Sequence, residues 1–304
     1  RNRAFSNFLK DNFVFTPCLS GRKQLIDYTK KFDAFILGSD QVWNPMLLGG
    51  DYYTLTWVDS RRPKVTYASS FGVSEIPASQ VKKTKEYLSR FNMISVREEQ
   101  GAEIVEKLTR KKAEVCCDPT VLTDRKRWDE LSGDCPFVSE KYIFCYFIGN
   151  NPSQREFAKK LAQKTGCKIL AVKHIDEYIK SDDDFGDIDY LEVGPKEFVN
   201  FIRYATYVCT DSFHGTIFSI MYNKNFFTFM RFSDSQKSSM NSRVKNILSI
   251  VGLSNRLFEN SITPEAALAY QVDWSDVNKR LNDFRKSSRE YFERAIICLK
   301  GTQE

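Results

Sequence analysis

The stretch Tyr207-Val-Cys-Thr-Asp-Ser-Phe-His-Gly-Thr-Ile-Phe-Ser-Ile-Met221 decides the fold of this 304-residue chain. Its apolar start, Tyr207–Cys209, is short enough for a buried parallel strand. The next residues offer N-caps, and the apolar positions from Ile217 to Met221 fit one face of a helix. His214 therefore falls at a strand-to-helix turn, the edge of an open α/β sheet where ligands bind. A helix N-terminus at that edge favours an anion.

Candidate strands alternate with candidate helices on both sides of this stretch, which predicts parallel sheets covered on both faces. The other expected strands are Phe32–Leu37, Lys64–Gly72, Met93–Arg97, Ala113–Cys117, Tyr142–Gly149, Cys167–Val172 and Asn225–Met230. The expected helices are Ala78–Arg90, Glu98–Leu108, Pro152–Thr165, Gly194–Ile202 and Ser275–Leu299.

The alternation restarts after a stretch with Gly, Pro and mixed charges, Leu131–Lys141, which is the best candidate linker. We therefore predict an N-terminal Rossmann-like domain at 1–135 and a second one at 136–274. The amphipathic segment at 275–304 could pack back on the first domain.

Composition and charge exclude several classes of protein. No run of eighteen apolar residues is present, and no signal peptide opens the chain. The eight cysteines form no CxxC pair and have no histidine at metal spacing, which predicts a reducing cytoplasm and no metal site. The net charge of +6 favours an anionic substrate or a membrane surface, but its basic residues are spread along the chain, so nucleic-acid binding is not indicated.

Common catalytic signatures are missing. The sequence contains no Walker A loop and no GxGxxG after a strand, so ATP and NAD lack their usual binding motifs. It also contains no HExxH and no GxSxG elbow, which argues against a zinc protease and an α/β-hydrolase.

Polar residues follow several predicted strands. Gly38-Ser-Asp-Gln-Val-Trp-Asn44 comes after the first strand, and its glycine lets the backbone approach a ligand. The alternative is a plain turn, with Asp40 as a cap and Trp43 as packing. Ser69 ends the next strand, and Arg97 ends the third, where a guanidinium could hold a carboxylate. The alternative for Arg97 is an ion pair with a neighbouring acid.

The two histidines differ in setting. His174 follows a strand beside an acidic loop, where a surface role is favoured. His214 combines a strand end, a helix start and the adjacent Asp211 and Ser212, which makes it a candidate general acid. Arg231 and Arg243 flank a polar loop and are further anion-binding candidates, each with solvent exposure as the alternative.

Five motifs occur in the order seen in the polysaccharide pyruvyl transferase family, which this chain resembles over roughly residues 30–255. They are Gly38–Asn44, Tyr67-Ala-Ser-Ser-Phe-Gly72, Ser95-Val-Arg-Glu98, Asp118-Pro-Thr120 and Thr210-Asp-Ser-Phe-His-Gly-Thr216. The resemblance implies two Rossmann-like domains in a GT-B-like arrangement, with the active site in the interdomain cleft. It also implies transfer of pyruvate from phosphoenolpyruvate to two sugar hydroxyls, with formation of a cyclic ketal and release of phosphate.

By this resemblance, Arg97 holds the donor and His214 lies near its phosphate and reacting carbon. The implied bases are Asp40 and Asp211. The other implied binding residues are Gly38, Ser39, Gln41, Trp43, Asn44, Ser69, Ser212, Gly215, Arg231, Lys237 and Arg243. Two departures stand out, because Ser212 occupies the position of a family arginine, and Arg231 or Lys237 must replace a family lysine. Trp43, Tyr67 and Phe71 are candidates to stack on a sugar, with core packing as the alternative.

The implied partners are phosphoenolpyruvate, with no further cofactor, and a saccharide acceptor that is free or lipid-linked. The implied location is the cytoplasm, with peripheral attachment to the inner face of the membrane left open. The family's first strand and turn are missing from the start of this chain. Two alternatives remain: a GT-B-type glycosyltransferase that uses a nucleotide sugar, and a non-catalytic saccharide-binding relative. The acceptor and the oligomeric state are open.

Overall fold

A computed structural model describes residues 2–46, 48, 51–173, 178–188, 190, 192–231, 241–258 and 262–301. Its chain forms two compact units. Unit 1 comprises Arg1–Val14, Thr123–Arg231 and Ile247–Arg280, and unit 2 comprises Phe15–Leu122, Phe232–Asn246 and Leu281–Glu304. The stretch 131–141, expected as a linker, lies within unit 1, where the Asn200 side-chain amide donates to the Ser132 and Cys135 carbonyls.

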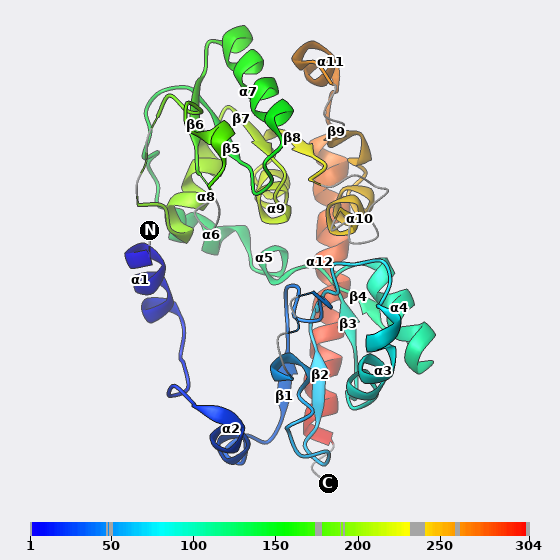
Figure 1. Cartoon of the computed structure of the whole chain (residues 1–304). Coiled ribbons are helices and arrows are strands. Elements are labelled where there is room, and N and C mark those ends of the chain that lie inside the picture. Colours follow the sequence, from blue (N-terminus) through cyan, green and yellow to red (C-terminus); the bar gives the residue numbers. More distant parts are fainter. Residues whose placement is uncertain are drawn as a thin grey trace. The chain divides into compact units, whose positions relative to one another are not determined.

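Unit 1 is built on a five-stranded parallel sheet of order β6-β5-β7-β8-β9. Its strands are β5 (Tyr142–Tyr146), β6 (Lys168–Ala171), β7 (Tyr207–Thr210), β8 (Asn225–Phe229) and β9 (Leu257–Phe258). Along the chain, β5 comes first and β6 pairs with one side of it. The strands β7, β8 and β9 then follow in that order on the other side of β5 (Figure 1). This order places a topological switch point between β5 and β7.

Helices cover both faces of this sheet because alternate residues of each strand point to opposite sides. Ile143 and Cys145 of β5 belong to the core cluster formed with α7 and α11. Phe144, between them in sequence, packs against Phe198 and Phe201 of α8 at ring distances of 5.6 and 6.0 Å. The helices of this unit are α1 (Asn2–Asn12), α6 (Arg125–Ser132), α7 (Pro152–Thr165), α8 (Pro195–Tyr204), α9 (Phe213–Met221) and α11 (Pro264–Ala269).

Unit 2 contains two pairs of parallel strands, β1 (Phe35–Leu37) with β2 (Lys64–Thr66) and β3 (Ser95–Val96) with β4 (Glu114–Val115). Parallel bridges from Val65 to Met93 and from Ser69 to Val96 connect the two pairs. The spatial order is therefore β1-β2-β3-β4, and the carboxyl ends of all these strands lie at one edge.

The helices of unit 2 also lie on both faces. A core cluster on one face contains Trp43, Phe71 and residues of α3 (Val81–Ser89) and α4 (Glu99–Thr109). A second cluster joins Val65 and Tyr67 to the Leu281–Gly301 part of α12 (Trp274–Gly301). The remaining elements are α2 (Gly21–Thr29), α5 (Pro119–Leu122), α10 (Ser242–Ile250) and the 3-10 turns at Tyr52–Thr54, Ala78–Gln80, Lys180–Asp182 and Ser254–Arg256.

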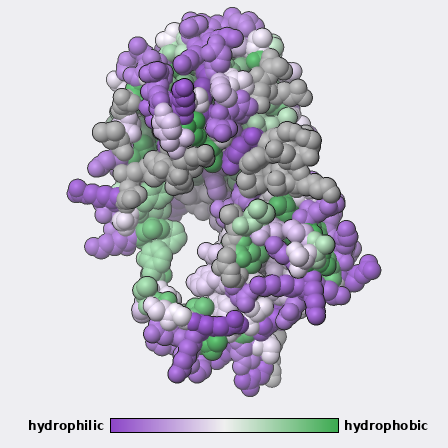
Figure 2. Space-filling view, in the orientation of Figure 1, coloured by the Kyte–Doolittle hydropathy of each residue, from purple (hydrophilic) through white to green (hydrophobic). Residues whose placement is uncertain are grey.

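The predicted α/β class with parallel sheets is confirmed, and Pro152–Thr165 has the bounds that its sequence indicated. Other helices agree within a few residues. The strands of unit 2 are shorter than expected, because β1, β3 and β4 begin later than predicted and β2 ends earlier, at Thr66. The arrangement of the two units and the cleft between them stay a prediction. Hydrophilic residues predominate on the face in Figure 2, and no helix among the described residues is both long and apolar enough to cross a bilayer.

Candidate functional site

Four turns meet at the carboxyl edge of the unit 2 sheet, one after each strand. The turn after β1 begins at Gly38, and its φ of +137° and its contact with β2 both require glycine, because a Cβ would lie 2.0 Å from the Tyr67 carbonyl oxygen. Bridges from Asp40 to Ser69 and from Ser69 to Val96 hold this turn against its neighbours. The residues predicted from separate motifs of this half are therefore brought together.

Arg97 is the centre of this edge and is almost fully buried, with 3% of its surface exposed. One terminal nitrogen donates to Oδ2 of Asp118 at 2.6 Å, and the other donates to Oδ1 of Asp40 at 3.0 Å. Burial alone lowers the pKa of the guanidinium, but the charges of Asp118, Asp40 and Glu98 raise it above its ordinary value. The ion pair that was the alternative for Arg97 is present, with Asp118 and Asp40 as its partners.

The two carboxylates that bind Arg97 differ in exposure. The Asp118 side chain is 4% exposed, and its Oδ1 also accepts from the Thr120 amide and hydroxyl. The Asp40 side chain is 63% exposed. Ser39 lies beside them, with its hydroxyl 2.6 Å from the Ala68 carbonyl oxygen and 3.5 Å from Oδ2 of Asp118. A ligand can reach Asp40 but not Asp118.

Glu98 organises the turn after β2, a role that its sequence position did not suggest. Its side chain is fully buried, and Oε1 accepts from the Ser70 hydroxyl at 2.9 Å and from the Phe71 amide at 3.2 Å. Ser69 itself is fully buried, with its hydroxyl donating to the Leu37 carbonyl at 3.2 Å. These contacts make Ser69 part of the scaffold of the edge.

Arg243 joins the same edge from the first turn of α10. With the Gln41 amide oriented so that its oxygen faces the guanidinium, both terminal nitrogens of Arg243 donate to that oxygen at 2.8 Å. Asn44 lies 2.8 Å from the same amide and accepts from the Met46 amide at 2.9 Å. Arg243 is 7% exposed, so the solvent-exposed alternative is wrong for this residue.

The aromatic side chains proposed as sugar platforms are all in the core. Trp43 and Phe71 are fully buried and lie 5.1 Å apart, and the Trp43 indole donates to the Tyr53 carbonyl at 3.3 Å. Tyr67 is 5% exposed and donates to the Cys117 carbonyl at 3.0 Å. The alternative of core packing is correct for these three, because their rings have no face available to a ligand.

His214 lies at the topological switch point of unit 1. It is in the first turn of α9, directly after β7, and it is half-buried, with its ring 5.3 Å from that of Phe213. Ser212 is the N-cap of this helix, and its hydroxyl accepts from the Gly215 amide at 3.3 Å. The strand, cap and helix predicted from the sequence are all present, so the imidazole lies beside the positive end of α9.

Asp211 connects the two strands that flank the switch point. Its carboxylate accepts from the Ile148 amide at 2.7 Å and from the Gly149 amide at 2.8 Å, both in the turn after β5. The turn requires glycine at position 149, because a Cβ there would lie 2.8 Å from Oδ2 of Asp211. Arg231, after β8, donates to the Asp211 carbonyl at 3.1 Å and lies 3.7 Å from Oδ2. Asp211 is therefore engaged on both oxygens and is 3% exposed.

A model of the polysaccharide pyruvyl transferase family matches residues 2–231, which is most of the chain. The chain belongs to the polysaccharide pyruvyl transferase family. Its members transfer pyruvyl groups to polysaccharide, so this protein is a transferase with a saccharide acceptor. No curated protein sequence matches it.

Solved structures similar to this pyruvyl transferase have low sequence identity. The UDP-GlcNAc 2-epimerase of Neisseria meningitidis is 10% identical, with 91% of this chain and 84% of that chain covered and a TM-score of 0.48. A wall teichoic acid polymerase is 11% identical, with 93% and 94% covered and a TM-score of 0.45. A putative UDP-N-acetylglucosamine 2-epimerase of Listeria monocytogenes is 9% identical, with 92% and 84% covered and a TM-score of 0.48.

Two candidates of the pyruvyl transferase fall outside the described residues, namely His174 and Lys237. Its eight cysteines are free thiols, and burial raises the pKa of Cys116 to about 12. Within the described ranges, no cluster of three or more His, Cys, Asp or Glu side chains is placed to hold a metal ion.

Sequence reasoning did not single out Asp118, Glu98 and Gly149 as site residues. Asp118 and Glu98 each belong to a quoted motif. Glu98 and Glu99 are the neighbouring acids in the ion-pair alternative for Arg97, whereas the position of Asp118 at a strand end could have suggested the pair that forms. No sequence signal identifies Gly149 as the partner of Asp211, because the two are 62 positions apart and meet only when β5 and β7 pair.

Proposed function

We propose that this transferase uses phosphoenolpyruvate as its donor and forms a pyruvate ketal on two hydroxyls of a sugar. The observation that carries the proposal is His214, which is placed at the positive end of α9 and at a switch point, in a chain of the pyruvyl transferase family. A helix N-terminus favours the binding of a phosphate, and protonation of the donor's enol carbon requires a nearby acid.

The chemistry assigns a proton to each step. His214 protonates the methylene carbon of the donor while a first sugar hydroxyl adds to the adjacent carbon and loses its proton to a base. The C–O bond to phosphate then breaks, and phosphate leaves with the electron pair. The second hydroxyl attacks the same carbon, and its proton ends on the released phosphate. No cofactor besides the donor takes part in this scheme.

The contacts of Asp40 and Asp211 favour Asp40 as the base. Both oxygens of Asp211 accept from backbone amides or lie near Arg231, so its proposed function is to hold the turn after β5 against His214. The Asp40 carboxylate is mostly exposed, and its Oδ1 accepts from Arg97. We therefore assign the proton of the first sugar hydroxyl to Asp40.

Arg97 and Asp40 also suggest how the donor binds. A donor carboxylate that displaces Asp40 from Arg97 would exchange one charge-assisted hydrogen bond for another and would free Asp40 to act on the acceptor. Asp40→Ala removes this competing carboxylate. We expect that variant to lower KM for phosphoenolpyruvate, because the competing carboxylate is gone, and to lower kcat, because the base is gone. An unchanged or higher KM would contradict the exchange.

The decisive experiment incubates the protein with phosphoenolpyruvate and a panel of oligosaccharides, and follows phosphate release and acceptor mass. We expect acceptor-dependent phosphate release and an acceptor that gains one pyruvate less one water. His214→Gln should lower kcat roughly 10²- to 10⁴-fold, with the urea unfolding midpoint unchanged as the control for folding. Tight binding of a nucleoside diphosphate with no response to phosphoenolpyruvate would instead support a nucleotide-sugar glycosyltransferase.

A further inference from the structure

A second concave site lies in unit 2, where the segment before and in α2 faces the crossover between β1 and β2. This cavity has a volume of about 660 Å³, within the roughly 300–1,000 Å³ of small-molecule pockets. Arg22 and Leu25 line one side, and Asp51, Tyr52 and Trp57 line the other. None of these residues belongs to the Arg97 edge or to the His214 turn.

The cavity contains a rigid pair of aromatic rings. Tyr52 and Trp57 stack with centroids 5.9 Å apart and an interplanar angle of 27°. The Trp57 indole also donates to the Tyr52 carbonyl at 2.9 Å, which fixes the spacing of the pair. Tyr52 is 56% exposed, so the pair presents a broad apolar surface with a phenol at its rim. Such amphipathic rings give contact area at a low cost in conformational entropy.

Charged groups border this aromatic surface. The Asp51 carboxylate lies 2.6 Å from the Lys83 ammonium and 3.5 Å from the Arg22 guanidinium. The hydrogen bond from Lys83 lowers the pKa of Asp51, so the side chain is an ionised acceptor at neutral pH. Arg22, whose side chain is 60% exposed, adds donors. Sugar hydroxyls both donate and accept, so this rim can satisfy them.

The aromatic pair is anchored to the predicted site of the same unit. The Trp43 indole donates to the Tyr53 carbonyl, and the Thr54 hydroxyl donates to the Asp51 carbonyl at 2.7 Å. The crossover that begins at Gly38 therefore carries the candidate residues at its start and the aromatic cavity further on. In a polymeric acceptor, the sugars next to the one that reacts also need a surface that binds them.

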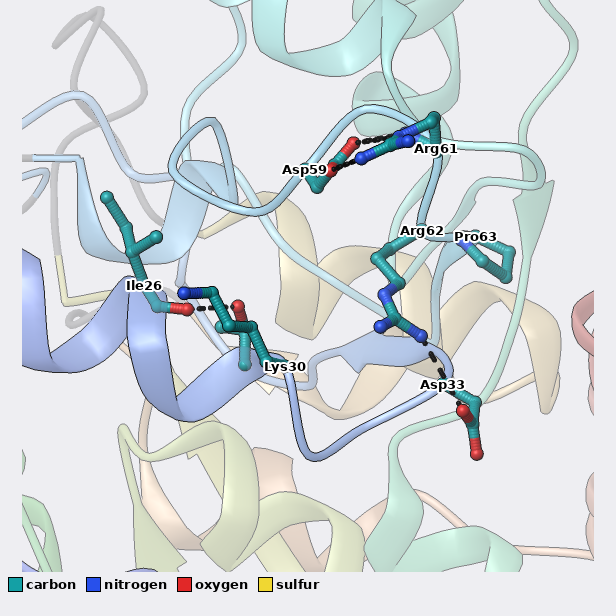
Figure 3. Close-up of a pocket in the computed structure, with 8 residues that line it drawn as sticks. Ile26, Lys30, Asp33, Asp59, Arg61, Arg62 and Pro63 are labelled. Carbon is teal, nitrogen blue, oxygen red and sulfur yellow. Dashed lines mark hydrogen bonds and ion pairs between the residues drawn. The ribbon is translucent and has the colours of Figure 1, made fainter.

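Another concave site on unit 2 lacks these features. It lies between α2 and the amino ends of β1 and β2, and its charged side chains pair with each other, as Asp51 does with Lys83 and Arg22 in the Tyr52 cavity. Figure 3 shows Arg61 facing Asp59 and Arg62 facing Asp33, with ion-pair distances of 2.7 and 3.5 Å. It has no aromatic ring in its lining. A saccharide therefore fits the Tyr52 cavity better than the cavity in Figure 3, because only the former offers an aromatic ring to pack against.

We propose that the cavity of Tyr52, Trp57, Asp51 and Arg22 is a subsite that binds a sugar of the acceptor chain next to the sugar that reacts. The proposal rests on the proposed function for its acceptor but concerns binding alone. A ring face packs on Tyr52, and its hydroxyls bond to Asp51 and Arg22.

The test is calorimetric titration of the full chain with glucose, galactose, and the hexasaccharides of cellulose, β-1,4-galactan, chitin and α-1,4-glucan. We expect at least one hexasaccharide to bind at least tenfold more tightly than the monosaccharides. Tyr52→Ala and Arg22→Ala should weaken that binding about tenfold. Tyr270→Ala is the matched control, because Tyr270 is an exposed tyrosine, 41% exposed, that does not line the cavity.

Two results would overturn the subsite: no hexasaccharide binding at 10 mM, or an equal loss of affinity in Tyr270→Ala and Tyr52→Ala. Phosphate release from phosphoenolpyruvate is measured on the same preparations. Sugar binding that depends on Tyr52 without any pyruvyl transfer supports the subsite and contradicts the proposed function. Pyruvyl transfer that Tyr52→Ala leaves unchanged for both short and long acceptors contradicts the subsite alone.

Discussion

The carboxyl edges of the two sheets stabilise their buried charges in different ways. In unit 2, a buried arginine is neutralised by two carboxylates from turns that follow β1 and β4. In unit 1, a buried carboxylate is held by backbone amides of the neighbouring turn, and a half-buried imidazole lies at a helix start. The first edge depends on side-chain charges, whereas the second depends mainly on backbone dipoles.

This difference shows which edge tolerates substitution. A buried ion pair that loses one partner leaves an uncompensated charge in a medium of low dielectric constant. A carboxylate bound by backbone amides depends on the shape of a turn, so steric changes in that turn should matter most. The contrast also indicates different roles for the two residues. Asp211 is bound by backbone amides and positions a turn, whereas Arg97 can exchange its exposed partner, Asp40, for a ligand.

Arg97→Ala tests the charge-dependent edge and should have the largest effect on folding. The change leaves Asp118 buried without its guanidinium partner, so we expect the free energy of unfolding to fall by roughly 3–5 kcal/mol. Urea denaturation followed by circular dichroism measures it. Arg61→Ala is the control, because the Arg61–Asp59 pair is exposed and solvent screening should leave it a small contribution to stability. Equal losses in both variants would remove the distinction between the buried and the exposed pair.

Gly149→Ala tests the backbone-dependent edge. The new Cβ would lie 2.8 Å from Oδ2 of Asp211, so the turn must shift, and we expect a loss of about 1–3 kcal/mol. Gly301→Ala is the control, since a Cβ there meets nothing within 4 Å. Because Gly301 is the last residue of α12, this variant should leave the stability nearly unchanged. Thermal denaturation of both variants measures these changes in stability. A Gly149→Ala variant as stable as the unchanged protein would show that the turn is not tightly packed.

Ser212 should give the smallest effect, through the cap of α9. Ser212→Ala removes the oxygen that accepts from the Gly215 amide, which should cost about 1 kcal/mol. Ser212→Gly should cost only a few tenths of a kcal/mol, because glycine is tolerated at an N-cap. This order reverses the usual preference of helices for alanine over glycine. If Ser212→Gly proved the more destabilising of the two in urea denaturation, Ser212 would not be acting as a cap.

The sequence predicted the local structure of unit 1 more closely than that of unit 2. Pro152 in a first turn, Ser212 as a cap and the short apolar run of β5 are local signals that lie within each element. The turns of unit 2 instead depend on distant partners. Trp43 illustrates this, because its position after Gly38 suggested a ligand platform, whereas contacts with Phe71, Tyr87 and Phe91 bury it.

By itself, the sequence determined the α/β class, the strand-to-helix turn that holds His214 and the order of motifs that marks the family, because these follow from periodicity, caps and turn chemistry along the chain. Only the tertiary structure decided which residues contact Arg97 and Asp211. Arg97 meets Asp40 and Asp118 across 57 and 21 positions, and Asp211 meets Gly149 across 62. The physical reason is that parallel strands bring their carboxyl ends to one edge, where strand order, which no local signal encodes, decides which side chains become neighbours.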